Sequence, residues 1–340
     1  MNSLKTFTPG KLYIAGEYSV VSRDTPAWII PTSQGVTCHI ESQSTFQYVS
    51  ARKKHTFDQT FETFDYNPLV KTVMKHIKSY LDTLEITLNP FKLTLTSTLS
   101  KHKKSLGLGS SGAITVALID TILKFHSIRL DALTLYKSAV MAQKSDLENA
   151  SYGDLAVAAY KSPVLYQPFK KDLFYTKEVD IMTPWEGLSI QPFSYPFLPM
   201  SVINLRKKAS SQKMVKAVLD SKNHSAYETF CTQTQAAFER LINAQKNEDV
   251  TLFLNTINTL FQIYASLGEA CNIPLLTPSM CEIENTLNHE QALKFSGAGG
   301  GDNVLVFHAR DALKTDFDAT IKKQRNRLLL NVRNDHVQKR

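Results

Sequence analysis

The spacing of apolar residues predicts a series of helices along the chain. Over residues 69–81 apolar side chains recur every three to four positions, which is the period of one helical face. A nearly continuous apolar run predicts a buried helix over 113–125, and Asp131 is placed to cap a further helix over 131–148. Shorter or amphipathic patterns predict the remaining helices, at 155–160, from Met214 onward, over 226–247 and over 250–267.

Short apolar or alternating runs between turn residues predict strands. Most of residues 5–50 has this character, with a short strand over 12–15 that begins after Pro9 and Gly10. Residues 91–98 alternate between apolar and polar side chains, and residues 303–307 resume a strand pattern late in the chain. Helices and strands do not alternate strictly, so the predicted fold class is α+β rather than a doubly wound parallel sheet.

An aromatic stretch that contains five prolines, residues 166–199, divides the chain. Its pattern indicates irregular strands that cross between two domains. We therefore predict an N-terminal domain over residues 1–198 and a C-terminal domain over 199–340. The chain has 340 residues, of which 43% are hydrophobic, and this is enough to form two sizeable cores.

A run of glycine and serine has the composition of a phosphate-binding loop. It consists of Gly107, Leu108, Gly109, Ser110, Ser111 and Gly112. Glycines leave backbone N–H groups free to face an anion, and the helix that follows adds the positive end of its dipole. Serine hydroxyls bind phosphate oxygens or a cation. The lysine of a Walker A motif is absent, so the run also fits a simple turn with an N-cap.

Two further segments carry candidate chemistry. In residues 9–18, Lys11 lies at the beginning of the predicted strand, where it also fits a solvated edge charge. Residues 296–302 contain four glycines. A hairpin turn needs only one or two glycines, so the excess indicates that another group approaches this backbone closely.

These three segments, in this order, resemble the motifs of the GHMP kinase superfamily, and the resemblance spans nearly the whole chain. Within the superfamily, Gly16-Glu17-Tyr18, the glycine run at 297–301 and Ser151-Tyr152-Gly153-Asp154 are most similar to the bacterial phosphomevalonate kinase family. The resemblance implies a two-domain fold with the active site in the cleft. The N-terminal domain would be like domain 2 of ribosomal protein S5, and the C-terminal domain would be ferredoxin-like.

The resemblance also implies roles for charged and hydroxyl side chains. Asp154 matches the catalytic aspartate, which would act as general base toward the acceptor, although the residues alone also fit an N-cap. Lys11 matches the catalytic lysine, which would lower the pKa of that base or screen the phosphoryl group in transfer. ATP and Mg²⁺ are the implied cofactors, and Ser111, in preference to Ser110, offers a hydroxyl to the metal.

Further residues are predicted to contact the substrates. Glu17 and Tyr18 match the place where the superfamily contacts its acceptor, although Tyr18 also fits an ordinary core tyrosine. Lysines and serines near the predicted loops are candidates for an acceptor phosphate, although a run of charges also fits a solvated surface. The full set comprises Glu17, Tyr18, Lys103, Lys104, Ser151, Ser210, Ser211, Ser296, Gly297, Ala298 and Gly299.

One position departs from the superfamily pattern. Many members have a glutamate eleven residues before the catalytic aspartate, and that glutamate helps to hold magnesium. This chain has Gln143 there. We therefore expect Ser111, the nucleotide phosphates and water to hold the metal, without a protein carboxylate.

The net charge and the cysteine content limit which binding partners and which cellular compartment we expect. The net charge of +8 is compatible with nucleic acid, membranes or small anions, but the lysines are dispersed and no nucleic-acid motif is present. Four widely spaced cysteines form no metal or disulfide pattern, and no apolar run has the length of a membrane span. We expect a cytoplasmic monomer or homodimer that binds neither nucleic acid nor membrane.

The resemblance implies ATP-dependent phosphorylation of 5-phosphomevalonate to 5-diphosphomevalonate, a step of isoprenoid precursor synthesis. The nearest alternative is mevalonate kinase or another small-molecule kinase of the superfamily. An alternative of another class is a non-catalytic nucleotide-binding regulator, which would be expected to lack Lys11 or Asp154. An RNA-binding protein is a more distant alternative.

Overall fold

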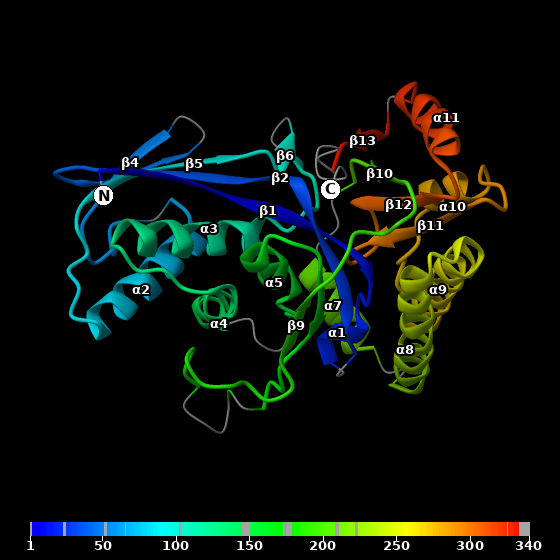
Figure 1. The fold of residues 1–340 in the computed structure, drawn as a ribbon, viewed down its shortest axis with the longest axis horizontal. Helices are drawn as coiled ribbons and strands as arrows, with labels where there is room; N and C mark the ends of the chain where they lie inside the picture. Colours follow the sequence, from blue (N-terminus) through cyan, green and yellow to red (C-terminus); the bar gives the residue numbers. More distant parts are fainter. Residues whose placement is uncertain are drawn as a thin grey trace.

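The computed structural model describes most of the chain as two sheets with their helices (Figure 1). It covers residues 2–22, 25–50, 53–64, 66–101, 104–144, 150–172, 174, 179–207, 211–221, 224–324 and 326–332. For Ser22, Ser211 and Gln212 it gives the backbone alone. The mixture of helices and largely antiparallel sheets confirms the predicted α+β class.

The N-terminal part of the described chain forms a sheet of seven strands. The central strand, β2, pairs with β1 along one side, and along the other side it pairs first with β8 and then with β5. The pairing of β3 with β5 is parallel, and the other pairings are antiparallel. The strands are β1 (Ser3–Ala15), β2 (Ala27–Ser42), β3 (Phe46–Ser50), β4 (Lys53–Phe57), β5 (Phe91–Ser97), β8 (Val164–Gln167) and β9 (Ser189–Pro192).

Strand β1 runs through Pro9 and Gly10, so the prediction that a strand begins only at Leu12 is wrong. The pairing with β2 shifts register between Pro9 and Lys11, which is a β-bulge. At the bulge the Lys11 N–H turns away from β2 and donates to the carbonyl oxygen of Leu108 at 2.9 Å. A Cβ on Gly10 would lie 2.7 Å from that same oxygen, so the strand can approach residue 108 only with glycine there.

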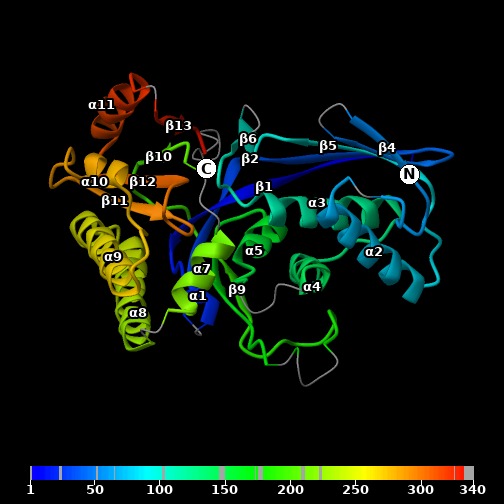
Figure 2. The same ribbon diagram turned by 180° about the vertical axis from the view of Figure 1, so that it is seen from behind.

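Four helices cover one face of this sheet (Figures 1 and 2): α2 (Pro68–Thr83), α3 (Ser110–Phe125), α4 (Ala132–Ala142) and α5 (Gly153–Tyr160). The predicted cap of α4 is confirmed, because the Asp131 carboxylate accepts from Thr134 N–H at 2.9 Å. Helix α4 ends at Ala142, six residues before the predicted end at 148, and residues 145–149 lie outside the described residues.

The second sheet contains, in order, β11 (Gln291–Ser296), β12 (Asn303–His308), β10 (Met200–Asn204) and β13 (Leu328–Leu330). Helices α8 (His224–Asn247) and α9 (Val250–Cys271) pack together on one side of it, and α10 (Pro278–Glu284) and α11 (Asp311–Lys322) complete the unit. The predicted boundary at 198 falls between β9 and β10. The division into two domains there stays a prediction.

Short elements connect or flank the two units. They are α1 (Ser19–Ser22), the hairpin of β6 (Ser100–Lys101) with β7 (Lys104–Ser105), and α7 (Ser211–Leu219). Helix α7 begins three residues earlier than predicted, and α9 extends four residues beyond its predicted end at 267. No helix in the described part of the chain has the length and apolar character needed to cross a membrane.

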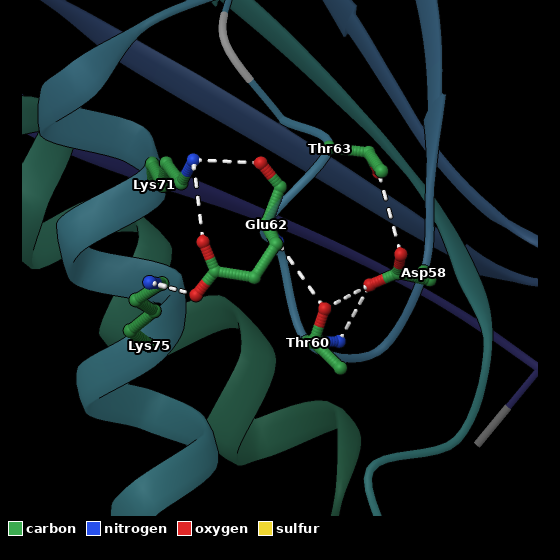
Figure 3. Close-up of polar contacts among 6 residues, drawn as sticks. All are labelled: Asp58, Thr60, Glu62, Thr63, Lys71 and Lys75. Atoms are coloured by element: carbon green, nitrogen blue, oxygen red, sulfur yellow. Dashed lines mark hydrogen bonds and ion pairs between the residues drawn. The ribbon is translucent and has the colours of Figure 1, made fainter.

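A network of hydrogen bonds and ion pairs on the surface links the loop before α2 to that helix (Figure 3). The ammonium groups of Lys71 and Lys75 contact the backbone and the carboxylate of Glu62, at 2.8 and 2.5 Å respectively. Within the loop, the Asp58 carboxylate accepts from the backbone N–H of Thr60 at 2.8 Å. Exposed pairs of this kind contribute little to stability, because solvent screens them. None of these residues lines the cavity described next, so the network is a local anchor of the loop.

Candidate active site

A cavity of about 450 Å³ lies where β1, the loop before α3, the start of α5 and the glycine loop between β11 and β12 meet. The structure thus brings together the segments that carry the predicted motifs. The predicted residues on its wall are Lys11, Glu17, Tyr18, Gly107, Gly109, Ser110, Ser111, Ser151, Asp154, Gly297 and Ala298.

Several predicted residues do not line the cavity. Leu108, Gly112 and Ser296 are buried behind its wall, and Gly299 lies against the backbone of Leu275. Lys104 is exposed on the β6–β7 hairpin and does not reach the cavity wall. Lys103 and Ser210 lie outside the described residues, as does the side chain of Ser211.

The backbone of the loop over 107–112 has the form of an anion cradle. Gly109 is the N-cap of α3 with φ of +75°, and this residue provides no side-chain cap for the first turn of the helix. The two serines therefore belong to the first turn instead of capping it, contrary to the alternative of a turn with a side-chain N-cap. Both line the cavity, so hydroxyls and the positive end of the α3 dipole face the same space.

Lys11 faces the cavity and is not a solvated edge charge. A Cβ on Gly109 would lie 2.8 Å from Lys11 Cγ and 3.5 Å from Asp154 Cβ, so both side chains lie close to the space that a side chain at position 109 would fill. A Cβ on Gly297, from the glycine loop, would lie 3.6 Å from Lys11 Nζ. Burial lowers the pKa of Lys11, and the nearby carboxylates, of which Asp154 has the largest effect, counteract this.

Asp154 lies inside the first turn of α5, whose N-cap is Tyr152. The interpretation of Asp154 as an N-cap residue is therefore wrong. Its carboxylate contacts the beginning of α3, because a Cβ on Gly112 would lie only 2.4 Å from Oδ2. Burial raises the pKa of Asp154, while Lys11 and the backbone N–H groups of Leu155 and Gly112 favour its charged form. A carboxylate with a neighbouring cation and a raised pKa is suited to accept a proton.

Tyr13 connects three of the predicted segments, and the sequence analysis did not identify it. Its hydroxyl is 2.9 Å from Ser151 Oγ, and its backbone N–H donates to Ser296 Oγ at 2.8 Å. Lys11 Nζ lies 5.2 Å from the centre of its ring, within the range of a cation–π contact. The only sequence signal was alternation along β1, which places residues 11 and 13 on one face of the strand.

The glycine loop is confined on both sides by other backbone. Cβ atoms on Gly299 and Gly301 would lie 2.6 Å from the carbonyl oxygen of Leu275 and 2.3 Å from that of Lys207. The predicted close approach is therefore an approach of protein backbone. Asp302, also not identified from sequence, ends the loop, and a Cβ on Gly107 would lie 2.7 Å from its Cγ.

Glu17 and Tyr18 are held by internal contacts although both line the cavity. The Glu17 carboxylate pairs with Lys294 and accepts from the Tyr264 hydroxyl at 2.7 Å. The Tyr18 hydroxyl donates to the carbonyl oxygen of Ala298, and the Tyr18 carbonyl accepts from Tyr227 at 3.0 Å. Lys294 was missed because a lysine within a buried strand has no distinguishing sequence pattern.

The metal-binding potential of the cavity rests on oxygen donors. Gln143 lines the cavity, and its amide donates to Thr115 Oγ1 at 2.5 Å. Within the described residues no group of three or more histidine, cysteine, aspartate or glutamate side chains is placed to hold a metal ion. Serine hydroxyls beside a phosphate cradle are hard donors, which fit Mg²⁺ when phosphates and water complete its shell.

The cradle, the Lys11–Asp154 pair and the two-unit fold define the class of protein. Residues 68–162 match the family model of the GHMP kinases N terminal domain. The resemblance to this superfamily and the fold class predicted from the sequence are thereby confirmed.

Within this class, the chain is similar to phosphomevalonate kinases. A curated relative, phosphomevalonate kinase of Streptomyces sp. (strain CL190), is 24% identical, and the match covers 86% of this chain and 87% of that protein. A crystal structure of the Lin0012 protein from Listeria innocua is 24% identical with a TM-score of 0.88, and covers 98% of both chains. Streptococcus pneumoniae phosphomevalonate kinase in complex with phosphomevalonate and AMPPNP is 22% identical with a TM-score of 0.83, covering 97% of this chain and 100% of that one.

Proposed function

We propose that the chain is an ATP-dependent phosphomevalonate kinase, which transfers the γ-phosphoryl group of ATP to 5-phosphomevalonate and releases ADP and 5-diphosphomevalonate. The observation that carries the proposal is the placement of Lys11 and Asp154 beside Gly109, on the wall of one cavity with the phosphate cradle. The names of the curated relative and of the S. pneumoniae complex agree with the function predicted from the sequence.

In the proposed reaction the residues position groups and stabilise charge. The N–H groups and serine hydroxyls at the start of α3 bind the phosphates of the nucleotide. Lys11, between the cradle and the glycine loop, stabilises the negative charge on the phosphoryl group in transfer. Asp154 accepts a hydrogen bond from the attacking oxygen of the acceptor and takes its proton when one is present. Transfer is direct and in line, without a phosphoenzyme.

In this proposal, oxygen donors of the chain help to bind Mg²⁺. Ser111, with Ser110 beside it, would contribute a hydroxyl to Mg²⁺, which neutralises phosphate charge when bound. Gln143 occupies the place of the superfamily glutamate, and its amide is engaged with Thr115. The proposal therefore includes no carboxylate ligand at that position.

The proposed function differs from its nearest alternative, mevalonate kinase, in the acceptor molecule that is phosphorylated. Lys11 is the one lysine or arginine among the described residues of the cavity wall. Of the further basic candidates for the acceptor phosphate, Lys103 lies outside the described residues and Lys104 does not reach the cavity wall. A non-catalytic regulator is disfavoured because Lys11 and Asp154 are both present and lie beside the cradle.

The proposal is tested by measuring ADP release from ATP and Mg²⁺ with 5-phosphomevalonate, with mevalonate or with no acceptor. We expect release only with 5-phosphomevalonate, and we expect Asp154→Asn to abolish most of it while ATP binding remains. Release with mevalonate in place of 5-phosphomevalonate would contradict the proposed acceptor. Release with neither acceptor would contradict the proposed activity.

A further inference from the structure

We infer that Lys294 is a positioning residue, which neutralises Glu17 so that the cavity wall formed by residues 16–18 accepts an anionic acceptor. This inference rests on the proposed function. Lys294 lies in β11, where all six residues are buried, and its own side chain is 0% exposed. A lysine so placed requires a partner, because an isolated buried ammonium group is strongly unfavourable.

The contacts of the Glu17 carboxylate join the first unit to the second. One oxygen of the Glu17 carboxylate lies 2.5 Å from Lys294 Nζ, and the other accepts from the Tyr264 hydroxyl at 2.7 Å. Lys294 Nζ also donates to the carbonyl oxygen of Phe295. Glu17 follows β1, whereas its partners Lys294 and Tyr264 belong to β11 and α9 respectively. Both carboxylate oxygens are thus occupied by the protein, which leaves Glu17 poorly suited to bind substrate directly.

Stability alone does not account for this pair. Replacing a buried ion pair with apolar side chains of similar volume is often neutral or stabilising, because the pair must first lose its hydration. The pair does hold a defined conformation, since Glu17 lies between Gly16 at φ of +95° and Tyr18 at φ of +62°. Positive φ at a tyrosine is unfavourable and persists only when surrounding contacts maintain it.

The electrostatic consequence concerns the cavity. Glu17 lies on its wall and is close enough to Lys11 to raise the pKa of that lysine. Without Lys294, the wall would present an uncompensated carboxylate to an acceptor that itself carries a carboxylate and a phosphate. Like charges placed together across an interface oppose binding. Lys294 supplies the compensating charge from behind the wall, leaving Lys11 available for the phosphoryl group.

The experiment compares Lys294→Met, Glu17→Gln and the double variant by calorimetric titration with 5-phosphomevalonate and, separately, with AMPPNP. We expect Lys294→Met to weaken binding of 5-phosphomevalonate on the order of tenfold, with a smaller effect on AMPPNP. Adding Glu17→Gln to Lys294→Met should restore most of that loss, because it removes the uncompensated charge. Lys161→Met is the matched control, since Lys161 pairs with buried Asp120 at 3.2 Å and does not line the cavity.

The double variant separates charge compensation from packing. A purely structural role of Lys294 predicts that Glu17→Gln brings no recovery, or a further loss, and either outcome would overturn the inference. If Lys294→Met fails to fold, as judged by circular dichroism, Glu17→Gln alone remains decisive. It should bind 5-phosphomevalonate more tightly than wild type by a few-fold, and weaker binding would overturn the inference. A failure of the proposed function is distinguished because it appears in the wild-type protein, as no binding and no turnover of 5-phosphomevalonate.

Discussion

Tyr13→Phe removes one hydroxyl from the cavity wall and keeps the aromatic ring beside Lys11. In the native protein this hydroxyl lies 2.9 Å from Ser151 Oγ, three residues before Asp154. The ring, 5.2 Å from Lys11 Nζ at its centre, is retained by phenylalanine with its cation–π contact. The substitution therefore tests whether the Tyr13–Ser151 bond holds the segment that carries Asp154, the proposed general base.

The expected magnitude follows from the single hydrogen bond that is lost. A neutral side-chain hydrogen bond contributes about 1 kcal/mol. If that free energy serves to position Asp154 in the transition state, kcat falls by about fivefold while KM for ATP stays near the wild-type value. Tyr13→Leu also removes the contact with Lys11, worth about 1 kcal/mol more, so the combined loss is about thirtyfold.

The assay is steady-state ADP release with 5-phosphomevalonate varied at saturating ATP and with ATP varied at saturating acceptor. Tyr48→Phe is the matched control, because Tyr48 is a buried tyrosine on β3 and does not line the cavity. Its hydroxyl interacts with Ser50, and burial raises its pKa to about 12. The control should lose thermal stability without losing turnover. A Tyr13→Phe enzyme with wild-type kcat would refute the positioning role of the hydroxyl.

Three further predictions follow from the site and the core. Asp154→Asn should lower kcat by about a hundredfold or more at pH 6. The loss should be smaller at pH 8, because an acceptor phosphate with a second pKa near 6 has released its own proton at that pH. An equal loss at both pH values would contradict this prediction. Lys11→Met should lower kcat by about a hundredfold while calorimetry shows much less effect on ATP binding, since its charge acts chiefly on the phosphoryl group in transfer. Burial lowers the pKa of His308 to about 4 despite the opposing effect of Asp318, so the folded state holds it neutral. The resulting stabilisation is complete above pH 6.5 and is lost as the pH falls to about 4, at a cost of about 3 kcal/mol; His308→Gln should flatten the urea-unfolding profile across that range.

Local patterns were sufficient to predict the elements that build the cradle. The apolar run over 113–125 and the glycine–serine run before it predicted a buried helix with a phosphate-binding start, and α3 begins at Ser110 within that run. Long periodic helices such as α2, α8 and α9 were also located to within a few residues. These features depend on the period of the side chains and on backbone propensity, which are local properties.

The bulge in β1 was not predictable from local pattern. Pro9 and Gly10 usually interrupt a strand, whereas here the strand continues through a bulge at which the Lys11 N–H donates to the carbonyl oxygen of Leu108. That carbonyl oxygen is nearly one hundred positions away in the chain. The orientation of Lys11 is therefore a tertiary property, although the resemblance to the superfamily had identified Lys11 as a candidate and this residue does line the cavity.

Residues that act by contacting another side chain were also not identified from the sequence. Lys294 and Tyr13 lie in strands whose patterns indicate burial, and their partners Glu17 and Ser151 come from other elements. Asp302 ends the glycine loop, yet its position against Gly107 depends on how the two units meet. Sequence motifs identified residues that lie beside the cradle. The residues that hold them in place could be identified only from the folded structure.

The most direct test of the account is to identify the product by ³¹P NMR after incubating the protein with ATP, Mg²⁺ and 5-phosphomevalonate. We predict that the phosphomonoester signal of the acceptor is replaced by the two coupled signals of a diphosphate ester, in step with formation of ADP. The same mixture with Asp154→Asn should retain the monoester. An unchanged monoester signal with the wild-type protein, or ADP formation without a new diphosphate ester, would contradict the central claim.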